Sequence, residues 1–534
     1  MKTHFCLSAT LVLGLCSGGE SVIRYVDAAA PGGSGLSWAT AHKTLQAAAS
    51  ASTPGDEVWV RKGVYSHTNS TPIIWAPSIE VYGGFSGNET ARAQRNANIN
   101  PTIVGGTGLA AFRMNTPTST PNVVDGFQFK NNKTDDGCIR MVNGVNIITN
   151  NKFMFNEGID SGCVISAAGG NLTFTQNYML LNKISVPSQT LANEGVIRLV
   201  SCNSTIESNA FIENATHLFL LPAAPVIGDI RAQGGTHNVV NNTFLKTISY
   251  GPGFPGFYAF RGFNTNLNFH NNIIRDTGFA SSPRVALTGS SVYSGVNNIW
   301  TLGLTNPVSG GLPHGTDLYA NTTFVSGGYD YHIDTSSPAY NSGDSSKYTW
   351  PVDVDALPRL DGPVVDRGAD ERNQKKQFVV DGFWPAQPPS FPTVGIGPEL
   401  QIVHLGTGVI AHSLPLPPIP GGGFAISVPL DEGVYDFIFR APLHTSDAIR
   451  AVIVDGDTNL RGLEFNPKAG DSNSDNSIDL LDYFVLSDAY NSFPGTTVWN
   501  PNADFNFDGS VDLLDYFVLS DNYNTTGAEI EIYP

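Results

Sequence analysis

The sequence is poor in cysteine, in basic residues and in long apolar runs. It has 5 cysteines among 534 residues, and 29 lysines and arginines against 47 aspartates and glutamates. So few cysteines exclude a disulfide scaffold, and a formal net charge of −18 argues against nucleic acid as a partner. After the first 19 residues no stretch approaches the roughly 20 apolar residues of a membrane span, so we expect none.

Turn-forming residues are abundant. The chain has 56 glycines and 34 prolines, which together with many asparagines and threonines favour a mostly β protein of several domains. At the N-terminus, a basic Lys2, an apolar stretch over 7–15 and small residues over 16–19 predict a signal peptide over 1–19. We therefore expect a protein that is secreted or held at the cell surface, with three cysteines after cleavage.

An internal repeat runs from about residue 110 to 300. A pair of mainly polar residues that ends in asparagine recurs every 26 to 33 residues, and the second position of each pair is Asn151, Asn177, Asn209, Asn242, Asn272 and Asn298. The residue two places later is apolar each time: Phe153, Met179, Phe211, Phe244, Ile274 and Trp300. Thirteen or fourteen residues before each asparagine begins a second element, whose middle residue is also apolar: Ile139, Val164, Ile197, Ile230, Phe260 and Ala286.

Two apolar columns at constant separation indicate a coil of short parallel strands in which each turn buries its inward residues on the next. We predict a right-handed parallel β-helix over 20–375, with the repeated asparagines forming an amide ladder at a tight turn. Residues 38–51, with Leu45, Ala48 and Ala49 on one helical face, are predicted to cap its first turn.

A column of arginines follows the second element. Five of seven turns carry one: Arg113, Arg140, Arg198, Arg231 and Arg261. If the middle residue points inward, these side chains point outward and lie close enough to need counter-charges. One interpretation is a structural ladder neutralised by Asp136, Glu194 and Asp229; the other is a groove for an anionic polysaccharide such as a uronate chain, because arginine binds carboxylates through two hydrogen bonds.

Two further features of the coil stay open. Cys138 and Cys163 are predicted in one outward column on adjacent turns, either as a disulfide or as two reduced thiols. The adjacent carboxylates Asp135 and Asp136 are a poor catalytic pair, since neighbouring strand residues point to opposite faces. His314 lies outside the repeat, so the catalytic residues are unknown.

Both ends of this region contain sequence motifs that are similar to those of a known family. Tyr25, Asp27, residues 82–87, residues 337–344 and residues 365–371 resemble segments of bacterial secreted right-handed β-helix proteins of the pectin-lyase-like superfamily, over about 22–372. The resemblance implies the fold and leaves the activity open, because that superfamily is functionally diverse. Beyond it we predict a linker rich in proline, glutamine and lysine over 376–398 and a small β-sandwich of alternating strands over 399–468.

The last domain, 469–534, contains two copies of one twelve-residue loop, 33 residues apart. Oxygen-bearing residues recur at the spacing that a hard cation needs: Asp471, Asn473, Asp475, Ser477, Asp479 and Asp482 in the first, and Asp504, Asn506, Asp508, Ser510, Asp512 and Asp515 in the second. Asn476 and Gly509 occupy the sixth position, where the loop turns sharply. We expect two calcium ions and folding driven by their binding.

A short helical run follows each loop, and the pair resembles a type I dockerin module. The resemblance implies calcium and a cohesin-like protein partner, which a symmetric pair of helices can bind in two orientations. Tyr483, Phe484, Tyr516 and Phe517 stand where that family carries basic residues. Cohesin docking and a self-contained stabilising cap therefore both remain open.

The leading hypothesis is a secreted modular carbohydrate-associated protein. Its β-helix would bind an extracellular polysaccharide, and its dockerin-like module would attach it in a calcium-dependent manner. The alternatives are a polysaccharide lyase or O-glycosyl hydrolase of the same superfamily, and a structural cell-surface protein.

Overall fold

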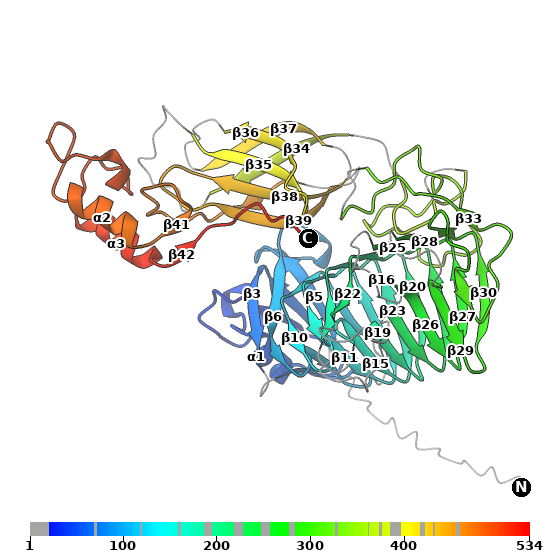
Figure 1. The fold of residues 1–534 in the computed structure, drawn as a ribbon. Helices are drawn as coiled ribbons and strands as arrows, with labels where there is room; N and C mark the ends of the chain where they lie inside the picture. The colour runs from blue at the N-terminus through cyan, green and yellow to red at the C-terminus, as the bar shows by residue number, and fades with distance from the viewer. Residues whose placement is uncertain are drawn as a thin grey trace, which may run out of the picture.

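The computed structural model describes residues 21–533 apart from short gaps at 69–71, 118–119, 159–161, 186–194, 218–227, 247–256, 277–282, 326–328, 361–362, 373–375, 385–396, 417–421, 431–432 and 455–459. The predicted signal peptide, 1–19, and Glu194 lie outside the described residues. Figure 1 shows a long coil of parallel strands, a two-sheet domain above it and a small helical domain at the far end of the chain. None of the described helices is long and apolar enough to cross a membrane.

Within the described residues the coil is built from three long parallel sheets. The first contains β1 (Ile23–Val26), β2 (Glu57–Arg61), β5 (Glu80–Phe85), β8 (Asn122–Asp125), β12 (Val145–Thr149), β16 (Asn171–Thr175), β20 (Asn203–Glu207), β24 (Thr236–Val240), β27 (Asn266–His270) and β30 (Val292–Val296). The second contains β22 (Ala215–His217), β18 (Lys183–Ser185), β14 (Glu157–Gly158), β10 (Lys133–Thr134), β6 (Thr102–Gly108), β9 (Phe127–Lys130), β13 (Lys152–Met154), β17 (Tyr178–Leu180), β21 (Ala210–Ile212), β25 (Thr243–Lys246), β28 (Ile273–Asp276), β31 (Ile299–Trp300) and β33 (Leu318–Tyr319), with β3 (Gly63–His67) beside β6.

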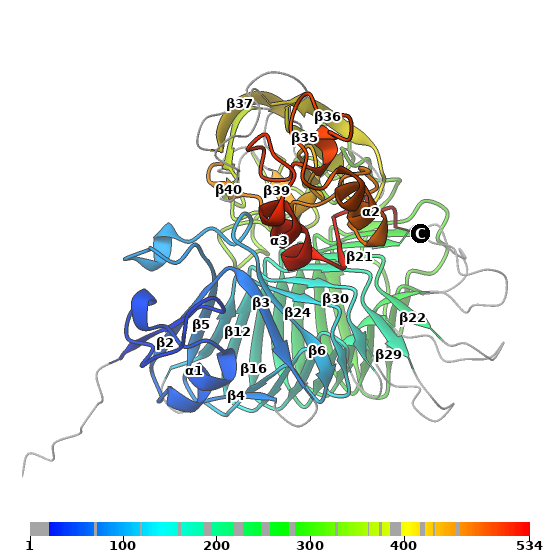
Figure 2. The same ribbon diagram turned by 90° about the vertical axis from the view of Figure 1, so that its left-hand side faces the viewer.

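The third sheet contains β32 (Val308–Ser309), β29 (Val285–Thr288), β26 (Tyr258–Phe263), β23 (Gly228–Gln233), β19 (Gly195–Val200), β15 (Ile165–Ala168), β11 (Ile139–Val142), β7 (Phe112–Met114) and β4 (Ile73–Trp75). The strands of each sheet pair with the next turn in parallel, so the predicted β-helix is confirmed. Figure 2 looks along this coil from the end of α1 (Leu45–Ala51), which follows η1 (Trp38–Thr40). Leu45, Ala48 and Ala49 of α1 are buried, as the helical spacing predicts.

The asparagine ladder occupies one corner of the coil. From Asn177 to Asn298, each asparagine accepts a hydrogen bond through its Oδ1 from the backbone N–H of the preceding turn's asparagine, at 2.9–3.0 Å. The residue before each one has positive φ, from Asn150 at 54° to Asn297 at 56°, which asparagine tolerates well. The ladder ends on Asp317, whose Oδ1 accepts from the Asn298 N–H at 2.8 Å.

A second ladder lies at another corner. Asn132, Asn156, Asn182 and Asn214 are buried and joined by Nδ2 to Oδ1 hydrogen bonds of 2.8–2.9 Å. The sequence repeat contained this signal, since these asparagines follow the first set by five residues. Together the two ladders satisfy the backbone where it leaves the second sheet on either side.

Strand register corrects part of the predicted inner column. Ile139 pairs with Ile165 rather than with Val164, and Phe260 pairs with Val285 rather than with Ala286. Both turns carry apolar residues at consecutive positions, so sequence alone could not choose between them. The interior is otherwise as expected, with Phe211 and Phe244 stacked at 4.6 Å between ring centroids.

The predicted position of the cysteines is wrong. Cys138 and Cys163 are fully buried in the apolar core rather than in an outward column, and both are free thiols. The Cys138 Sγ lies 3.2 Å from the carbonyl oxygen of Cys163, to which it donates. The structure thus shows the two reduced thiols of the sequence alternatives, and burial raises the pKa of both.

The boundary of the second domain also differs from the prediction. The first eight residues of the predicted linker, 376–398, form β34 (Lys376–Phe383), which pairs antiparallel with β37 (Gly423–Leu430). With β40 (Leu463–Glu464) they make one sheet, and β36 (Ile410–Pro415), β35 (Glu399–His404), β38 (Gly433–Arg440) and β39 (Asp447–Val454) make the other. Polar residues at the start of β34 hid the alternation of its buried Phe378 and Val380.

The described residues of segment 320–372 form no long strands, and they pack along the outside of the coil beside β33 (Figure 1). Arg359 is fully buried there and fastens the segment to the coil, since its Nη2 donates to the Ser208 hydroxyl at 2.7 Å. The sandwich also contacts the coil, where the Lys152 ammonium donates to the Ala451 carbonyl and to Asn98 Oδ1. The last domain comprises β41 (Ser477–Ile478), α2 (Leu480–Ala489), η3 (Pro501–Ala503), α3 (Leu513–Asn522) and β42 (Thr525–Thr526).

Candidate functional site

The two C-terminal loops, 471–482 and 504–515, fold in the same way. In the first, Asp471 accepts hydrogen bonds from the N–H groups of Asp475 at 3.1 Å and Asn476 at 2.9 Å. In the second, Asp504 accepts from Asp508 at 3.1 Å and Gly509 at 2.9 Å. The sixth residues, Asn476 and Gly509, have φ of 68° and 85°, the left-handed region that their small or amide side chains allow. Each loop therefore wraps round its first aspartate.

The twelfth residue ties each loop to its helix. Asp482 is fully buried and accepts from Ser472 N–H at 2.8 Å through one oxygen and from Asp479 N–H at 2.8 Å through the other. Asp515 does the same with Phe505 and Asp512, at 2.8 and 2.9 Å. Since Asp479 also caps α2, loop shape and helix position are linked.

The loops crowd negative charge. Burial raises the pKa of Asp471 to about 6, and the neighbouring Asp482 and Asp475 add to that shift. Burial likewise raises the pKa of Asp515 to about 6 and raises that of Asp504. Such carboxylates suit a hard cation that supplies the missing positive charge.

The other predicted ligands fall in equivalent places. The third loop position is occupied by Asn473 and Asn506, and the fifth by Asp475 and Asp508. At the seventh position, Ser477 N–H donates to Asp475 Oδ1 at 3.0 Å, and Ser510 N–H donates to Asp508 Oδ1 at 2.9 Å. Position seven offers its backbone carbonyl in loops of this kind. The structure thus brings all twelve predicted residues into two compact loops.

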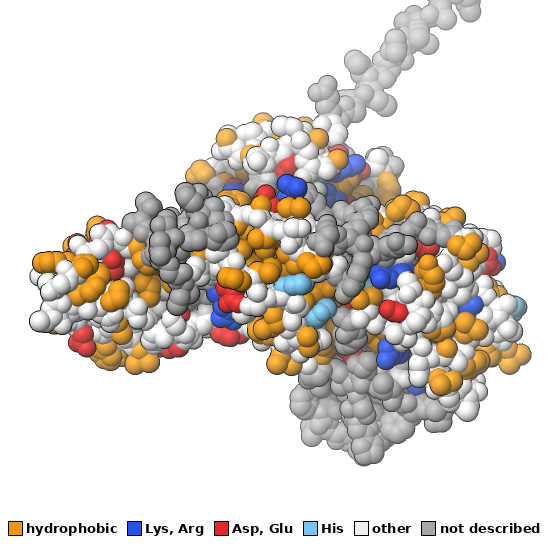
Figure 3. Space-filling model, turned by 90° about the horizontal axis from the view of Figure 1, so that it is seen from above, with side chains coloured by type: hydrophobic (Ala, Val, Ile, Leu, Met, Phe, Trp, Pro, Cys, Tyr) orange, Lys and Arg blue, Asp and Glu red, His pale blue; other side chains and the backbone are white. Residues whose placement is uncertain are grey.

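Each helix presents an apolar face to solvent. In α2 the exposed residues are Leu480, Leu481, Tyr483 and Phe484, and in α3 they are Leu513, Leu514, Tyr516 and Phe517. The exposed fractions of equivalent residues agree closely, for instance 54% for Leu481 and 55% for Leu514. Hydrophobic side chains gather on this lobe at the left of Figure 3. Exposed apolar patches of this kind mark interaction surfaces.

On the coil, strand register places the arginines in one row. Arg113 pairs with Arg140, and Arg198 pairs with Arg231, which pairs with Arg261; Ser166 fills the position between the two groups. All five arginines are partly exposed and follow a buried residue, so they point outward. Asp136 is the counter-charge of the first two, at 3.5 Å from Arg113 and 2.5 Å from Arg140.

Asp229, one of the predicted counter-charges, lies beside a buried lysine. It is buried, and desolvation raises its pKa to about 7 although the nearby Lys246 lowers it. Burial in turn lowers the pKa of Lys246, whose ammonium donates to the Asn214 carbonyl. Arg284 and Asp276, also buried, form an ion pair of 2.6 Å in the same region. Sequence reasoning missed this group because its members come from different positions of successive turns.

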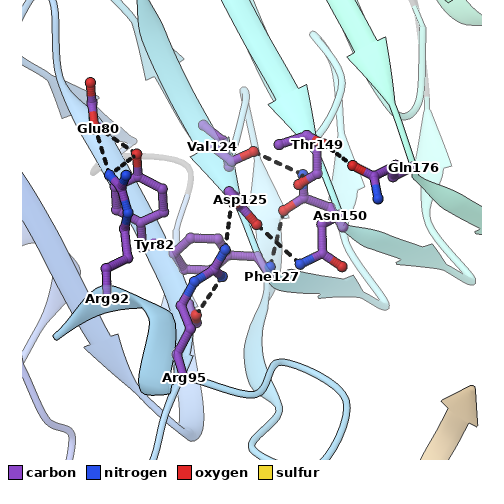
Figure 4. A network of polar contacts seen from close by, with 12 residues as sticks. Glu80, Tyr82, Arg92, Arg95, Val124, Asp125, Phe127, Thr149, Asn150 and Gln176 are labelled. Carbon is purple, nitrogen blue, oxygen red and sulfur yellow. Dashed lines mark hydrogen bonds and ion pairs between the residues drawn. The ribbon is translucent and has the colours of Figure 1, made fainter. Parts of the chain in front are cut away.

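A polar network covers the outward face of the first sheet near its start (Figure 4). Arg95 and Asn150 both contact Asp125, at 2.6 and 3.1 Å, and Arg92 donates to the Tyr82 hydroxyl at 2.6 Å while lying over its ring. These contacts fasten the segment around η2 (Arg92–Gln94) to the coil. Two residues considered from the sequence as catalytic candidates lie elsewhere. Asp136 forms ion pairs with Arg113 and Arg140, and the His314 ring contacts the Thr316 hydroxyl at 2.9 Å in a turn outside the repeat.

Comparisons with known proteins give one family match and several distant structural matches. Residues 469–522 match the model of the Dockerin type I domain. No curated protein matches the sequence. A mutant type II cohesin–X-dockerin complex from Acetivibrio cellulolyticus matches at 20% identity and a TM-score of 0.22, over 28% of this chain and 97% of the other. The pectate lyase Pel9A matches at 14% identity and a TM-score of 0.32, over 67% of this chain and 98% of the lyase. Type I dockerin domains bind calcium, and residues 469–522 of this chain are a Dockerin type I domain.

Proposed function

We propose that the C-terminal domain binds two calcium ions and attaches this extracellular protein to a cohesin-like partner. The observation that carries the proposal is the repeated unit of loop and helix, in which a buried aspartate joins a candidate calcium site to an exposed apolar face. The ligands would be Asp471, Asn473, Asp475, the Ser477 carbonyl, Asp479 and Asp482 in the first loop, and Asp504, Asn506, Asp508, the Ser510 carbonyl, Asp512 and Asp515 in the second.

Calcium controls the binding face through the loops. Without the cation, the mutual repulsion of the carboxylates opposes the closed loop; with it, Asp482 and Asp515 hold the first turns of α2 and α3. Because the two apolar faces are alike, either one can occupy the same groove on a partner. The tyrosines and phenylalanines supply contact area in place of basic side chains.

Binding to immobilised type I and type II cohesin domains tests the proposal. We expect binding in calcium and none in EGTA. Leu481→Asp or Leu514→Asp alone leaves one face intact and lowers affinity by less than tenfold, whereas the double variant abolishes binding. Leu302→Asp, at another exposed leucine on the coil, is the matched control. Binding that survives the double variant, or that ignores calcium, contradicts the proposal.

A second proposal concerns the coil, which we propose binds an anionic polysaccharide. The row of five outward arginines supports it: Arg113, Arg140, Arg198, Arg231 and Arg261. Neighbouring strands lie about 4.8 Å apart, so the row extends along the coil axis and could follow a polymer with repeated carboxylates.

Retention on polygalacturonate and alginate tests this second proposal. Arg198→Ala with Arg231→Ala should weaken retention strongly, and Arg440→Ala on the sandwich should not. Unchanged retention by the double variant refutes it. Unsaturated or reducing-end products in the same incubation would favour the lyase or hydrolase alternative, and neither retention nor products would favour a structural cell-surface role.

A further inference from the structure

The segment 320–372 contains a buried cluster that the repeat does not explain. His332, Asp355 and Asp370 each offer one ligand atom, and the three atoms lie within 4.8 Å of one another. The side chains of His332 and Asp355 are fully buried, and Asp370 is 2% exposed. They come from three separate stretches of the segment that packs on the outside of the coil.

Two atoms at the centre of this cluster, His332 Nε2 and Asp355 Oδ2, face each other at 3.1 Å. They form an ion pair when the imidazole is doubly protonated. With a neutral ring whose proton is on Nδ1, the Nε2 lone pair would face the carboxylate without a hydrogen bond, which is costly in a buried site unless a cation lies between them. In a tetrahedral site with bonds of 2.0–2.2 Å, ligand atoms lie roughly 3.3–3.6 Å apart. The His332 Nε2 to Asp355 Oδ2 separation of 3.1 Å is slightly shorter, and all three ligand atoms lie within 4.8 Å.

The opposite atom of each side chain is already held. His332 Nδ1 lies 2.5 Å from Asp330 Oδ1, which accepts from it when Nδ1 carries the proton; a neutral ring in that tautomer turns its Nε2 lone pair to the centre. The Tyr331 hydroxyl donates to Asp355 Oδ1 at 2.5 Å, and Ile333 N–H donates to Asp370 Oδ2 at 2.8 Å. A carboxylate behind a histidine and hydrogen bonds behind the carboxylates are the outer contacts that orient metal ligands.

Nearby cations do not fill this position. Lys152 interacts with Asp355 from a distance, but its ammonium donates to Asn98 at 2.9 Å and to the Ala451 carbonyl. Arg359 donates to Ser208 and to the carbonyls of Gly368 and Ala369. The centre therefore gathers three carboxylates, those of Asp330, Asp355 and Asp370, around one imidazole.

We propose that His332, Asp355 and Asp370 bind one divalent transition-metal ion of the zinc class. An imidazole ligand favours zinc over calcium or magnesium, which prefer oxygen ligands alone. The ion would join three stretches of the segment to one another close to the sandwich, and would therefore be structural. It is separate from the calcium loops of the last domain.

Metal analysis of the whole protein tests this inference. Tag-free protein is dialysed against zinc and excess calcium, freed of loose metal, and measured by inductively coupled plasma mass spectrometry. We expect one equivalent of zinc in the wild type and less than 0.1 in His332→Gln or Asp355→Asn. Asp330→Asn keeps the ligands and should weaken zinc about 10–100-fold. His412→Gln, at a histidine of the sandwich edge, is the control.

The wild-type result decides the matter even if a variant folds poorly. X-ray absorption of the bound zinc should show nitrogen and oxygen ligands without sulfur. No retained zinc in the wild type, together with a doubly protonated His332 ring in its NMR spectrum, would overturn the inference and leave an imidazolium held between Asp330 and Asp355.

Discussion

Replacing Asn209 with alanine would remove the centre of the first asparagine ladder. The Asn209 side chain is fully buried, and its Nδ2 donates to Phe174 O at 2.8 Å, to Glu207 O at 3.0 Å and to Asn242 Oδ1 at 3.0 Å. Its Oδ1 accepts from the backbone N–H and the side chain of Asn177, at 2.9 and 3.1 Å. A net loss of about 1 kcal/mol for a buried hydrogen bond, and up to about 3 for a group left unpaired, predicts a local destabilisation of about 3–5 kcal/mol.

Hydrogen exchange measures this effect at the site, and avoids assuming that a repeat coil unfolds in one step. The expected destabilisation would speed exchange of the Asn177 amide by about 10²–10⁴-fold in saturating calcium. Asn171→Ala is the control, because Asn171 is exposed and accepts one side-chain hydrogen bond of 3.3 Å from Asn203. An increase below tenfold in Asn209→Ala would refute the view that the ladder holds the turns together.

Three other predictions follow from buried groups. Asp471 and Asp515 have pKa values raised to about 6, so calcium-free protein should have a last domain that is most stable near pH 4 and loses stability as pH rises through about 6. Calcium affinity should instead fall as pH drops below 6, because the protonated carboxyls bind the cation poorly. Hydrogen exchange of 469–522 and calcium titrations at several pH values measure the two trends, and a flat profile in either contradicts them. Cys138 and Cys163 should stay unlabelled by a thiol reagent in the native protein and react after denaturation without reductant, whereas a disulfide would leave them unreactive in both conditions. Arg359→Leu should lower the free energy of unfolding of segment 320–372 by about 3 kcal/mol, so that protease cleaves this segment before it cleaves the coil. Simultaneous cleavage of the segment and the coil would argue that Arg359 does not fasten the segment separately.

The repeated asparagines made the coil predictable. Their side chains occupy one corner in successive turns, so their spacing gave the turn length and the inner position of residues such as Phe211. The register at Ile165 and Val285 was not predictable, because an apolar neighbour competes at each position. The inward position of Cys138 was missed for the same reason.

The sites differed in how much sequence could reveal. Each calcium loop is continuous in sequence, so Asp471 and Asp504 could be assigned from spacing alone. The cluster of His332, Asp355 and Asp370 joins three stretches that share no repeat, and only the packing of 320–372 on the coil brings them together. The start of the sandwich at β34 depended in the same way on pairing with a distant strand.

Calcium titration of the whole protein by isothermal calorimetry tests the central claim most directly. The account predicts two ions in the wild type and one in Asp515→Asn, with slower hydrogen exchange in both α2 and α3 once wild-type protein is saturated. A wild type that binds no calcium or a single ion in 469–534, or helices whose exchange ignores calcium, would contradict the claim that the twin loops govern attachment.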